Sequence, residues 1–376
     1  MIRTAIKYIR FEKTKSIGIV IGIVISVFLI GQQLATLGFL TSLMGGVIEN
    51  ANPDVAQVWV VGNQVTQANS LSTLNSSLVN EIKSIEGVKE TYAASVGAAI
   101  VKFDNGQTAP VILVGSDAPY FAAGPNPEKI IDGSVEDLQA DRNVSADFFD
   151  ASTFDYPIKK GTRMEINNKE AVISVITRNA RGFGGSYMFT GLANERLFTN
   201  QSPDAINAVL VQTKDDPQKI AQKINATFHG VKAFTSNDFR NKTVNVVIVS
   251  SNIGLSIGSL IVFAVISGFF IIGLLLYSST FDRIKDYGTL KAIGANNRYL
   301  IKLIFLQSLL YAIVGFVIAI ALLFGMKAGT EKAGLLLQIT PMLLLELLLM
   351  TLFISVGGSF FAIQKIRKLE PASVFK

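Results

Sequence analysis

The sequence predicts a polytopic α-helical membrane protein with four transmembrane helices and a large extracytoplasmic α+β domain between the first two. The chain of 376 residues is 49% hydrophobic and only 16% charged, which is too apolar for an ordinary soluble protein. Four long runs account for this composition, and among them they contain a single charged residue, Glu346. A helix needs about 20 residues to cross a bilayer. The expected spans are therefore 17–40, 252–277, 302–326 and 339–363.

Basic residues predict the orientation of these spans. Residues 1–16, 278–302 and 364–376 together hold 14 basic and 4 acidic residues, so the rest of the chain is net negative although the total is +6. Because short loops rich in Lys and Arg stay in the cytoplasm, both termini and the 278–302 loop are expected there. The sequence pI of 9.3 then reflects membrane topology, and the sequence does not favour a nucleic-acid partner. The first apolar run is too long for a signal peptide and lacks a clean cleavage site.

The first 16 residues form an amphipathic pattern. Ile2, Ile6 and Ile9 recur at helical spacing among basic residues, as in a helix that lies on the inner leaflet. A simple charged flank of the first span is the alternative. The uncharged runs around the first two spans exceed the bilayer thickness on the outer side, at 40–50 and 240–252. We therefore expect both helices to continue outward as a stalk.

The outer domain, about 53–238, contains a strand–helix–strand pattern twice. Strands are expected at 55–61 and 206–213, each followed by a helix with its isoleucines on one face and then by another strand. This repetition predicts a split βαβ core with a sheet packed against two helices. Residues 116–200 would form a β-rich insertion, including a hairpin that turns at Asn167-Asn168. The segment "RGFGGSYMF" (181–189) is expected to be a flexible outer loop, or else a loop that contacts a partner or ligand.

No catalytic or metal-binding motif is present in the sequence. It lacks a phosphate-binding GxxxxGK[ST] loop, a GxSxG elbow and an HExxH pair. Cysteine is absent, and the single histidine, His229, cannot form a multi-histidine metal site. The sequence therefore predicts that this chain has no catalytic residues, no metal and no cofactor of its own.

The polar segment between the second and third spans predicts a short amphipathic helix. Ile284, Tyr287, Leu290 and Ile293 share one stripe, and Gly294 stands where a helix should end. Charge and topology leave two possibilities open. The helix is either an ordinary interfacial connector or a docking helix for a cytoplasmic partner.

Three segments resemble the MacB/FtsX-like permeases of the type VII ABC transporters. "DYGTLKAIGANNRYL" is similar to that family's E-x-G-T-L-K-A-I-G-A signature, with Asp286 at the acidic position. "FLQSLLYAIVGFVIAI" resembles its third span, and "AIQKIRKLEPASVFK" resembles its C-terminal pattern. The start of the chain is most similar to the DevC branch. The resemblance covers both ends of the chain, and the outer domain only in outline.

This resemblance implies an exporter permease with a porter-like periplasmic core. Two copies would form a homodimer in the inner membrane, in contact with membrane lipids and with two ABC ATPase subunits that bind ATP and Mg. A periplasmic adaptor (membrane fusion protein) and an outer-membrane channel would complete the system, which would export a lipid, glycolipid or hydrophobic compound. The residues that would couple the permease to the ATPase are Arg283, Ile284, Asp286, Tyr287, Gly288, Leu290, Lys291, Ile293 and Gly294.

Two polar residues inside the spans are further candidates, Gln307 and Glu346. A carboxylate at this depth is costly unless it is neutral or paired. Glu346 would either contact substrate or adaptor near the outer leaflet, or form a structural hydrogen bond or reach the outer surface.

Two other functions remain open from the sequence. One is FtsX-like signal transmission to periplasmic cell-wall hydrolases, and the other is a membrane receptor without transport.

The expected segments are a cytoplasmic amphipathic helix (1–16), transmembrane helix 1 and stalk (17–52), the periplasmic domain (53–238), stalk and transmembrane helix 2 (239–277), the cytoplasmic coupling helix (278–300), transmembrane helix 3 (301–326), a periplasmic loop (327–338), transmembrane helix 4 (339–363) and a cytoplasmic tail (364–376).

Overall fold

The structure, a computed structural model, describes residues 1–11 and 13–367. The chain divides into two compact units. Met1–Phe39 together with Ile253–Lys376 form the helical unit, and Leu40–Asn252 form the α+β unit. Residues 368–376 of the expected cytoplasmic tail, and Glu12 of the expected N-terminal helix, lie outside the described residues.

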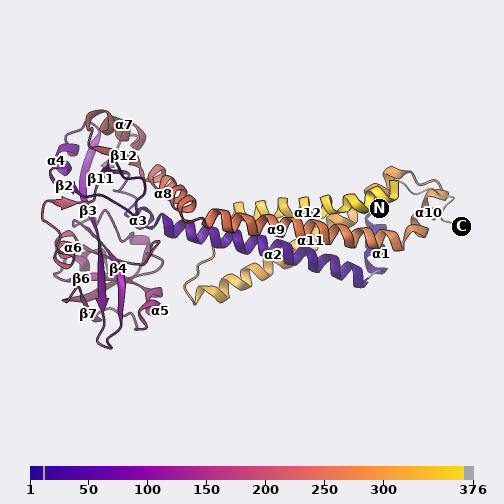
Figure 1. Cartoon of the computed structure of the whole chain (residues 1–376), viewed down its shortest axis with the longest axis horizontal. Coiled ribbons are helices and arrows are strands. Elements are labelled where there is room, and N and C mark those ends of the chain that lie inside the picture. Colours follow the sequence, from indigo (N-terminus) through magenta and orange to yellow (C-terminus); the bar gives the residue numbers. More distant parts are fainter. Residues whose placement is uncertain (12, 368–376) are drawn as a thin grey trace. The chain divides into compact units, whose positions relative to one another are not determined.

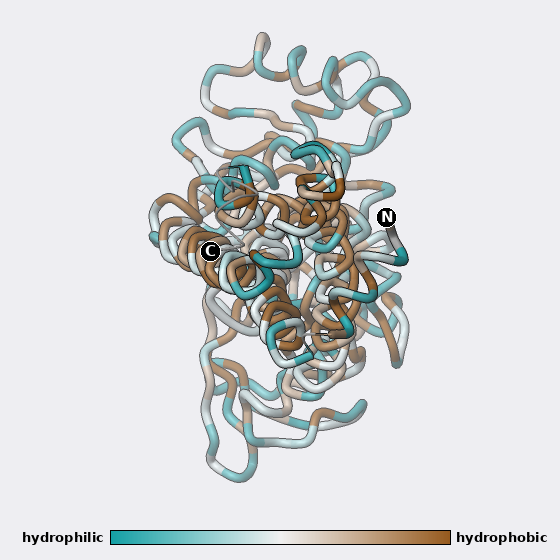
Figure 2. Tube along the Cα trace, turned by 90° about the vertical axis from the view of Figure 1, so that its right-hand side faces the viewer, coloured by the Kyte–Doolittle hydropathy of each residue, from teal (hydrophilic) through white to brown (hydrophobic). Residues whose placement is uncertain are grey.

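Within its described residues, the helical unit contains four helices long and apolar enough to cross a membrane (Figure 1). They are α2 (Lys13–Met44), α9 (Ile253–Asp282), α11 (Asn297–Glu331) and α12 (Pro341–Arg367). The shorter helices α1 (Ile2–Phe11) and α10 (Ile284–Ala292) belong to the same unit. Figure 2 shows how strongly hydrophobic residues dominate the long helices. The predicted class, four spans with a large α+β domain between the first two, is confirmed.

Helices α9 and α12 form the closest helix pair of the bundle. A Cβ atom at Gly273 of α9 would lie 2.6 Å from the ring of Phe361 and 3.2 Å from the carbonyl oxygen of Gly358, both on α12. Glycine therefore allows the two backbones to approach closely, as small residues do between membrane helices. Elsewhere on α9 large apolar side chains stay exposed, for example Leu255 (76%) and Phe263 (66%).

The core of the α+β unit is a β-α-β-β-α-β fold. Its strands run in the spatial order β12-β1-β11-β3, and each neighbouring pair is antiparallel. Alternation along β1 divides the side chains between two cores: Val58 and Val60 pack beneath the helices, whereas Trp59 and Val61 pack on the other face. The elements are β1 (Val58–Gly62), α4 (Ser77–Lys83), β3 (Val88–Lys102), β11 (Ala208–Thr213), α7 (Pro217–Thr227) and β12 (Val231–Thr235).

The insertion between the two halves is rich in strands, as expected. The 15-residue strand β3 leaves the four-stranded core and pairs with β4, which precedes the insertion, and with β7 inside the insertion. The two-residue turn between β7 and β8 is at Asn167-Asn168, both with positive φ, which confirms the predicted hairpin. The elements are β4 (Thr108–Ser116), η1 (Pro127–Lys129), β5 (Ile130–Asp132), η2 (Val135–Gln139), β6 (Asn143–Asp147), η3 (Phe148–Asp150), α5 (Ala151–Phe154), β7 (Arg163–Ile166), β8 (Lys169–Thr177), β9 (Ser186–Gly191) and α6 (Leu192–Thr199).

Four short elements complete the α+β unit. Strand β2 (Leu74–Asn75) pairs with β10 (Ala205–Ile206). Helices α3 (Gly46–Glu49) and α8 (Ser236–Ser250) pack together and are joined by an ion pair between Glu49 and Arg240. The expectation of one continuous helix through the second stalk and second span is wrong. Helix α8 ends at Ser250, Asn252 adopts a left-handed conformation (φ 56°), and α9 begins at Ile253.

Candidate functional site

Helix α10 is the strongest candidate site, and local sequence sets both of its borders. At its end, Gly294 has φ +102° and donates its N–H to the carbonyl of Lys291 (3.0 Å), while Ala295 donates to the carbonyl of Leu290 (2.9 Å). This pair of bonds is a Schellman motif. Two residues later the side chain of Asn296 accepts a hydrogen bond from the N–H of Tyr299 and caps α11. The expected helix end at Gly294 is confirmed.

The structure divides the predicted stripe between two environments. Tyr287 is 1% exposed and packs in the core of the helical unit, and Gly288 is also buried. Ile284 and Leu290 are partly buried against the same core, whereas Ile293 is 76% exposed. The stripe of four apolar residues therefore does not form a single face for a partner, because the chain's own bundle covers most of it.

The exposed face of α10 carries mixed charge. Lys285, Asp286 and Thr289 are exposed, together with Ile293. Helical spacing places these residues on one side of α10. Lys291 is half-buried. This face combines one exposed apolar side chain with a charged surround, which is an arrangement suited to docking on another protein surface.

Arg283 links α10 to the N-terminal helix α1. It is 7% exposed, and its guanidinium donates to the carbonyl oxygen of Tyr8 (2.7 Å) and lies over the rings of Tyr8 (4.6 Å) and Phe11 (5.4 Å). The Tyr8 ring also lies 5.8 Å from that of Tyr287. The sequence motif grouped Arg283 with the partner-contacting residues and gave no indication of a contact with Tyr8 or Phe11. The amphipathic pattern of the first residues was the only signal that could have indicated them.

The two intramembrane candidates lie in different surroundings. Gln307 of α11 is 8% exposed inside the bundle, whereas Glu346 of α12 is partly exposed. Among residues 1–11 and 13–367, the Glu346 side chain forms no hydrogen bond or ion pair. Both roles considered for Glu346, a contact with substrate or adaptor and a structural role, stay predictions. His229 lies in the loop between α7 and β12, and the described part of the chain contains no cluster of residues that could hold a metal ion.

A buried acidic site in the α+β unit was missed by sequence analysis. Asp147 and Asp150 are 0% and 1% exposed. Ser186 donates to Oδ1 of Asp150 (2.8 Å), and the backbone N–H of Ala180 donates to Oδ2 of Asp147 (2.7 Å). The Arg181 guanidinium lies 3.9 Å from Asp147. Asp150 and Ser186 line a small cavity of about 170 Å³.

Burial dominates the electrostatics of this acidic site. It raises the pKa of Asp150 to about 7; the neighbouring carboxylate of Asp147 adds to the rise, and the hydrogen bond from Ser186 opposes it. Burial also raises the pKa of Asp147, and it lowers the pKa of the nearby Lys129. The lining of this cavity contains no histidine, so the site does not form a Ser-His-Asp triad. The glycine-rich segment 181–189 contributes to the lining of this cavity. Gly182 is buried, and a Cβ atom there would overlap the Tyr187 side chain, so close packing requires a glycine at this position.

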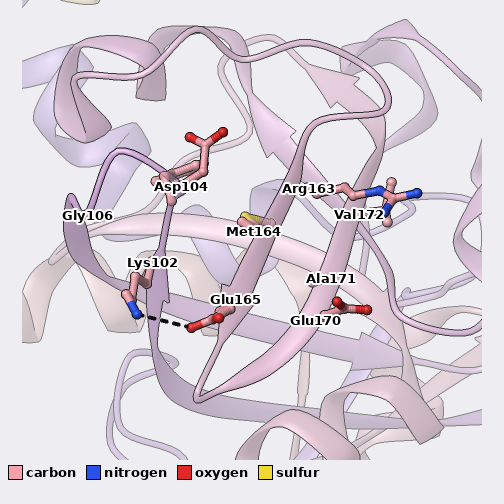
Figure 3. A pocket seen from close by; sticks show the side chains of 10 residues that line it. Lys102, Asp104, Gly106, Arg163, Met164, Glu165, Glu170, Ala171 and Val172 are labelled. Atoms are coloured by element: carbon pink, nitrogen blue, oxygen red, sulfur yellow. Dashed lines mark hydrogen bonds and ion pairs between the residues drawn. The ribbon is translucent and has the colours of Figure 1, made fainter.

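A second concavity, at the end of the insertion, is lined by charged residues. Figure 3 shows Lys102 of β3 directed toward Glu165 of β7, at 3.5 Å. Asp104, Arg163 and Glu170 also line this cavity of about 540 Å³. Both members of the ion pair are about half exposed, so water screens their attraction. The arrangement is that of a solvated charged surface.

Comparison with known proteins associates the C-terminal part of the chain with one family. Residues 258–371 match the FtsX-like permease C-terminal family. An uncharacterized ABC transporter permease of Methanocaldococcus jannaschii is 24% identical over 237 residues, and the match covers 59% of this chain and 59% of that protein.

Two solved structures are similar to part of the chain. The periplasmic region of MacB from Actinobacillus actinomycetemcomitans is 12% identical with a TM-score of 0.38, and the match covers 52% of this chain and 94% of that one. The extracellular domain of the noncanonic ABC-type transporter YknZ from Gram-positive bacteria is 14% identical with a TM-score of 0.36, over 48% of this chain and 100% of that one.

Proposed function

We propose that this chain is the permease subunit of an ABC exporter, because residues 258–371 match the FtsX-like permease C-terminal family. A separate ATPase subunit would bind ATP and Mg and dock on α10. The substrate would be a lipid, glycolipid or other hydrophobic compound. Two copies of the chain would work with two ATPase subunits, a periplasmic adaptor and an outer-membrane channel, as in DevC-like systems.

The observation that carries this proposal is the exposed face of α10. The helix begins two residues after the apolar helix α9 ends and stops at a Schellman motif. Ile293 is 76% exposed and is surrounded by the charged and polar residues of the same face, and an apolar centre with a polar rim is typical of protein interfaces. The expected topology supports the same assignment, since the basic residues of 278–302 favour the cytoplasmic side of the membrane.

The proposed mechanism is mechanical transmission. Closure of two ATPase subunits on ATP would displace α10, and α10 would move the bundle because Tyr287 and Gly288 are buried in it. Helix α1 would move with α10 through the Arg283 contacts. Helices α2 and α9 would carry the displacement toward the α+β unit. The bundle needs no aqueous pore for this work.

The test is recovery of the ATPase with variants of α10. Ile293→Asp removes an apolar contact and adds a carboxylate. Burial of such a side chain contributes about 1.5–3 kcal/mol, so ATPase recovery should fall about 10-fold or more. The measurement is affinity purification of the full chain from native membranes with quantification of bound ABC ATPases.

Val249→Asp is the matched control, because Val249 is 77% exposed but lies on α8 of the α+β unit. It should leave ATPase recovery unchanged. Normal recovery with Ile293→Asp would make α10 an interfacial connector only. Co-purified adaptor would support export, whereas a co-purified cell-wall hydrolase would support FtsX-like signal transmission.

A further inference from the structure

The helical unit contains an apolar groove between α1, α2 and α11. Its volume is about 680 Å³, within the range of ligand sites. Ile17 and Ile21 of α2 and Val314 and Ile318 of α11 form its walls, and each of these side chains is 41–58% exposed. The groove is therefore open to the surroundings of the bundle and is not a packed interior space.

The polar atoms at the floor of the groove already have partners. The Ser16 hydroxyl donates to the carbonyl of Ile9 (2.9 Å) and lies 2.8 Å from the Tyr311 hydroxyl. Both Ser16 and Tyr311 are less than 10% exposed. The groove thus presents hydrocarbon and leaves little hydrogen-bonding capacity for a polar ligand.

One end of the groove is basic. Arg10 of α1 and Lys13 at the start of α2 line it and are exposed, and the described residues of its lining include no acidic side chain. Neither has an ion-pair partner among residues 1–11 and 13–367, in contrast to Lys15, which pairs with Asp282. Glu12 lies outside the described residues. Two cations therefore stand beside an apolar groove.

We propose that this groove binds an anionic phospholipid of the leaflet that contacts α1. One acyl chain lies along α2 and α11, and the phosphate is held by Arg10 and Lys13. The charge complements an anionic headgroup, and the amphipathic helix α1 is suited to the bilayer surface. A lipid accounts for both halves of the site, since a soluble anion would leave the apolar walls open to water. This site is separate from the exposed face of α10 and does not depend on an ATPase.

Lipid retention by the purified full chain tests the proposal. Native mass spectrometry in detergent, titrated with phosphatidylglycerol or phosphatidylcholine, should show preferential binding of phosphatidylglycerol. Arg10→Ala with Lys13→Ala should weaken that binding about 30-fold, the loss expected for two basic side chains at an anionic lipid. Val314→Trp should displace the acyl chain and reduce binding of both lipids. Inorganic phosphate should not compete.

Lys7→Ala is the matched control, because Lys7 is an exposed basic residue of α1 that does not line the groove. Its phosphatidylglycerol binding should equal that of the wild type. Equal binding of the two lipids by the wild-type chain would overturn the proposal. So would wild-type retention in both the Arg10/Lys13 and Val314 variants, which would assign the lipid to the general bilayer annulus. These measurements contain no ATPase, so their outcome is independent of the function proposed for α10.

Discussion

The contribution of Asp150 to the free energy of unfolding depends on pH. Its pKa is about 7 in the folded chain, compared with about 4 for an aspartate in an unfolded chain. Between these pH values the folded state keeps a proton that the unfolded state has released. The free energy of unfolding therefore falls as pH rises from about 4 to about 7, and the contribution of Asp150 is fully present only below pH 4.

Asp150→Asn should flatten this pH dependence. The amide has a similar shape and can still accept the hydrogen bond from Ser186, but it does not ionise. The measurement is hydrogen exchange of the β9 amides in the full chain, corrected for intrinsic exchange rates. In the wild type, these amides should be less protected at about pH 8 than at about pH 5. In the Asn variant, most of this difference should disappear. Asp155→Asn, at an exposed position, should behave like the wild type. An unchanged pH response in the Asp150 variant would show that other groups cause it.

Gly46 lies where the surrounding backbone leaves no room for a side chain. A Cβ atom there would lie 2.6 Å from the carbonyl oxygen of Arg181 and 2.7 Å from Cα of Gly182. Gly46→Ala should destabilise the chain by about 1–3 kcal/mol, the usual cost of overpacking. Thermal unfolding of the purified chain would measure the loss. Gly230→Ala is the control, since a Cβ atom there meets nothing within 4 Å, and its effect should stay within about 0.5 kcal/mol.

Helices α1 and α10 are short elements that depend on each other. An isolated helix of their length is marginal in water, and each gains contacts from the other through Arg283 and the Tyr8–Tyr287 ring pair. This dependence means that the N-terminal helix is not simply a charged flank of the first span. A displacement of α10 by a docked protein would reach α1 directly.

Arg283→Ala should release α1. The substitution removes one charge-assisted hydrogen bond and the cation–π contacts, together worth about 2 kcal/mol, or about 30-fold in the opening equilibrium. Hydrogen exchange across residues 2–11 should accelerate accordingly. Arg298→Ala, at an exposed position at the start of α11, should leave that exchange unchanged. If the α1 amides stay protected in the Arg283 variant, the contacts of Arg283 do not hold α1 against the bundle.

At the scale of the whole molecule, charge distribution and the four apolar helices together predict one topology. The chain contains no cysteine, so single-cysteine labelling needs no prior substitutions. Cysteine at Lys13 or Arg298 should react only from the cytoplasmic side, and cysteine at Asn105 should react from outside. All three positions are exposed. Reaction of the Asn105 variant from the cytoplasmic side would contradict the proposed topology and with it the docking role of α10.

Several parts of this protein could be predicted from the sequence because they depend on local rules. The four long helices follow from uncharged runs of sufficient length. The hairpin at Asn167-Asn168 follows from two residues that tolerate positive φ, and the end of α10 follows from Gly294. The split core followed from two strand–helix–strand patterns. Each of these signals lies within one continuous segment of the chain, where backbone conformation and periodicity decide the result.

Only the tertiary structure decided what covers each apolar or charged side chain. Helical spacing grouped Tyr287 with Ile293, yet Tyr287 is buried in the chain's own bundle and Ile293 is exposed. Arg283 contacts Tyr8, 275 positions away in the sequence, and Asp150 becomes buried through strands brought together by the insertion. A spacing pattern indicates that a residue has an apolar neighbour or a partner. It does not identify that neighbour, because contacts between distant segments depend on how the whole chain packs.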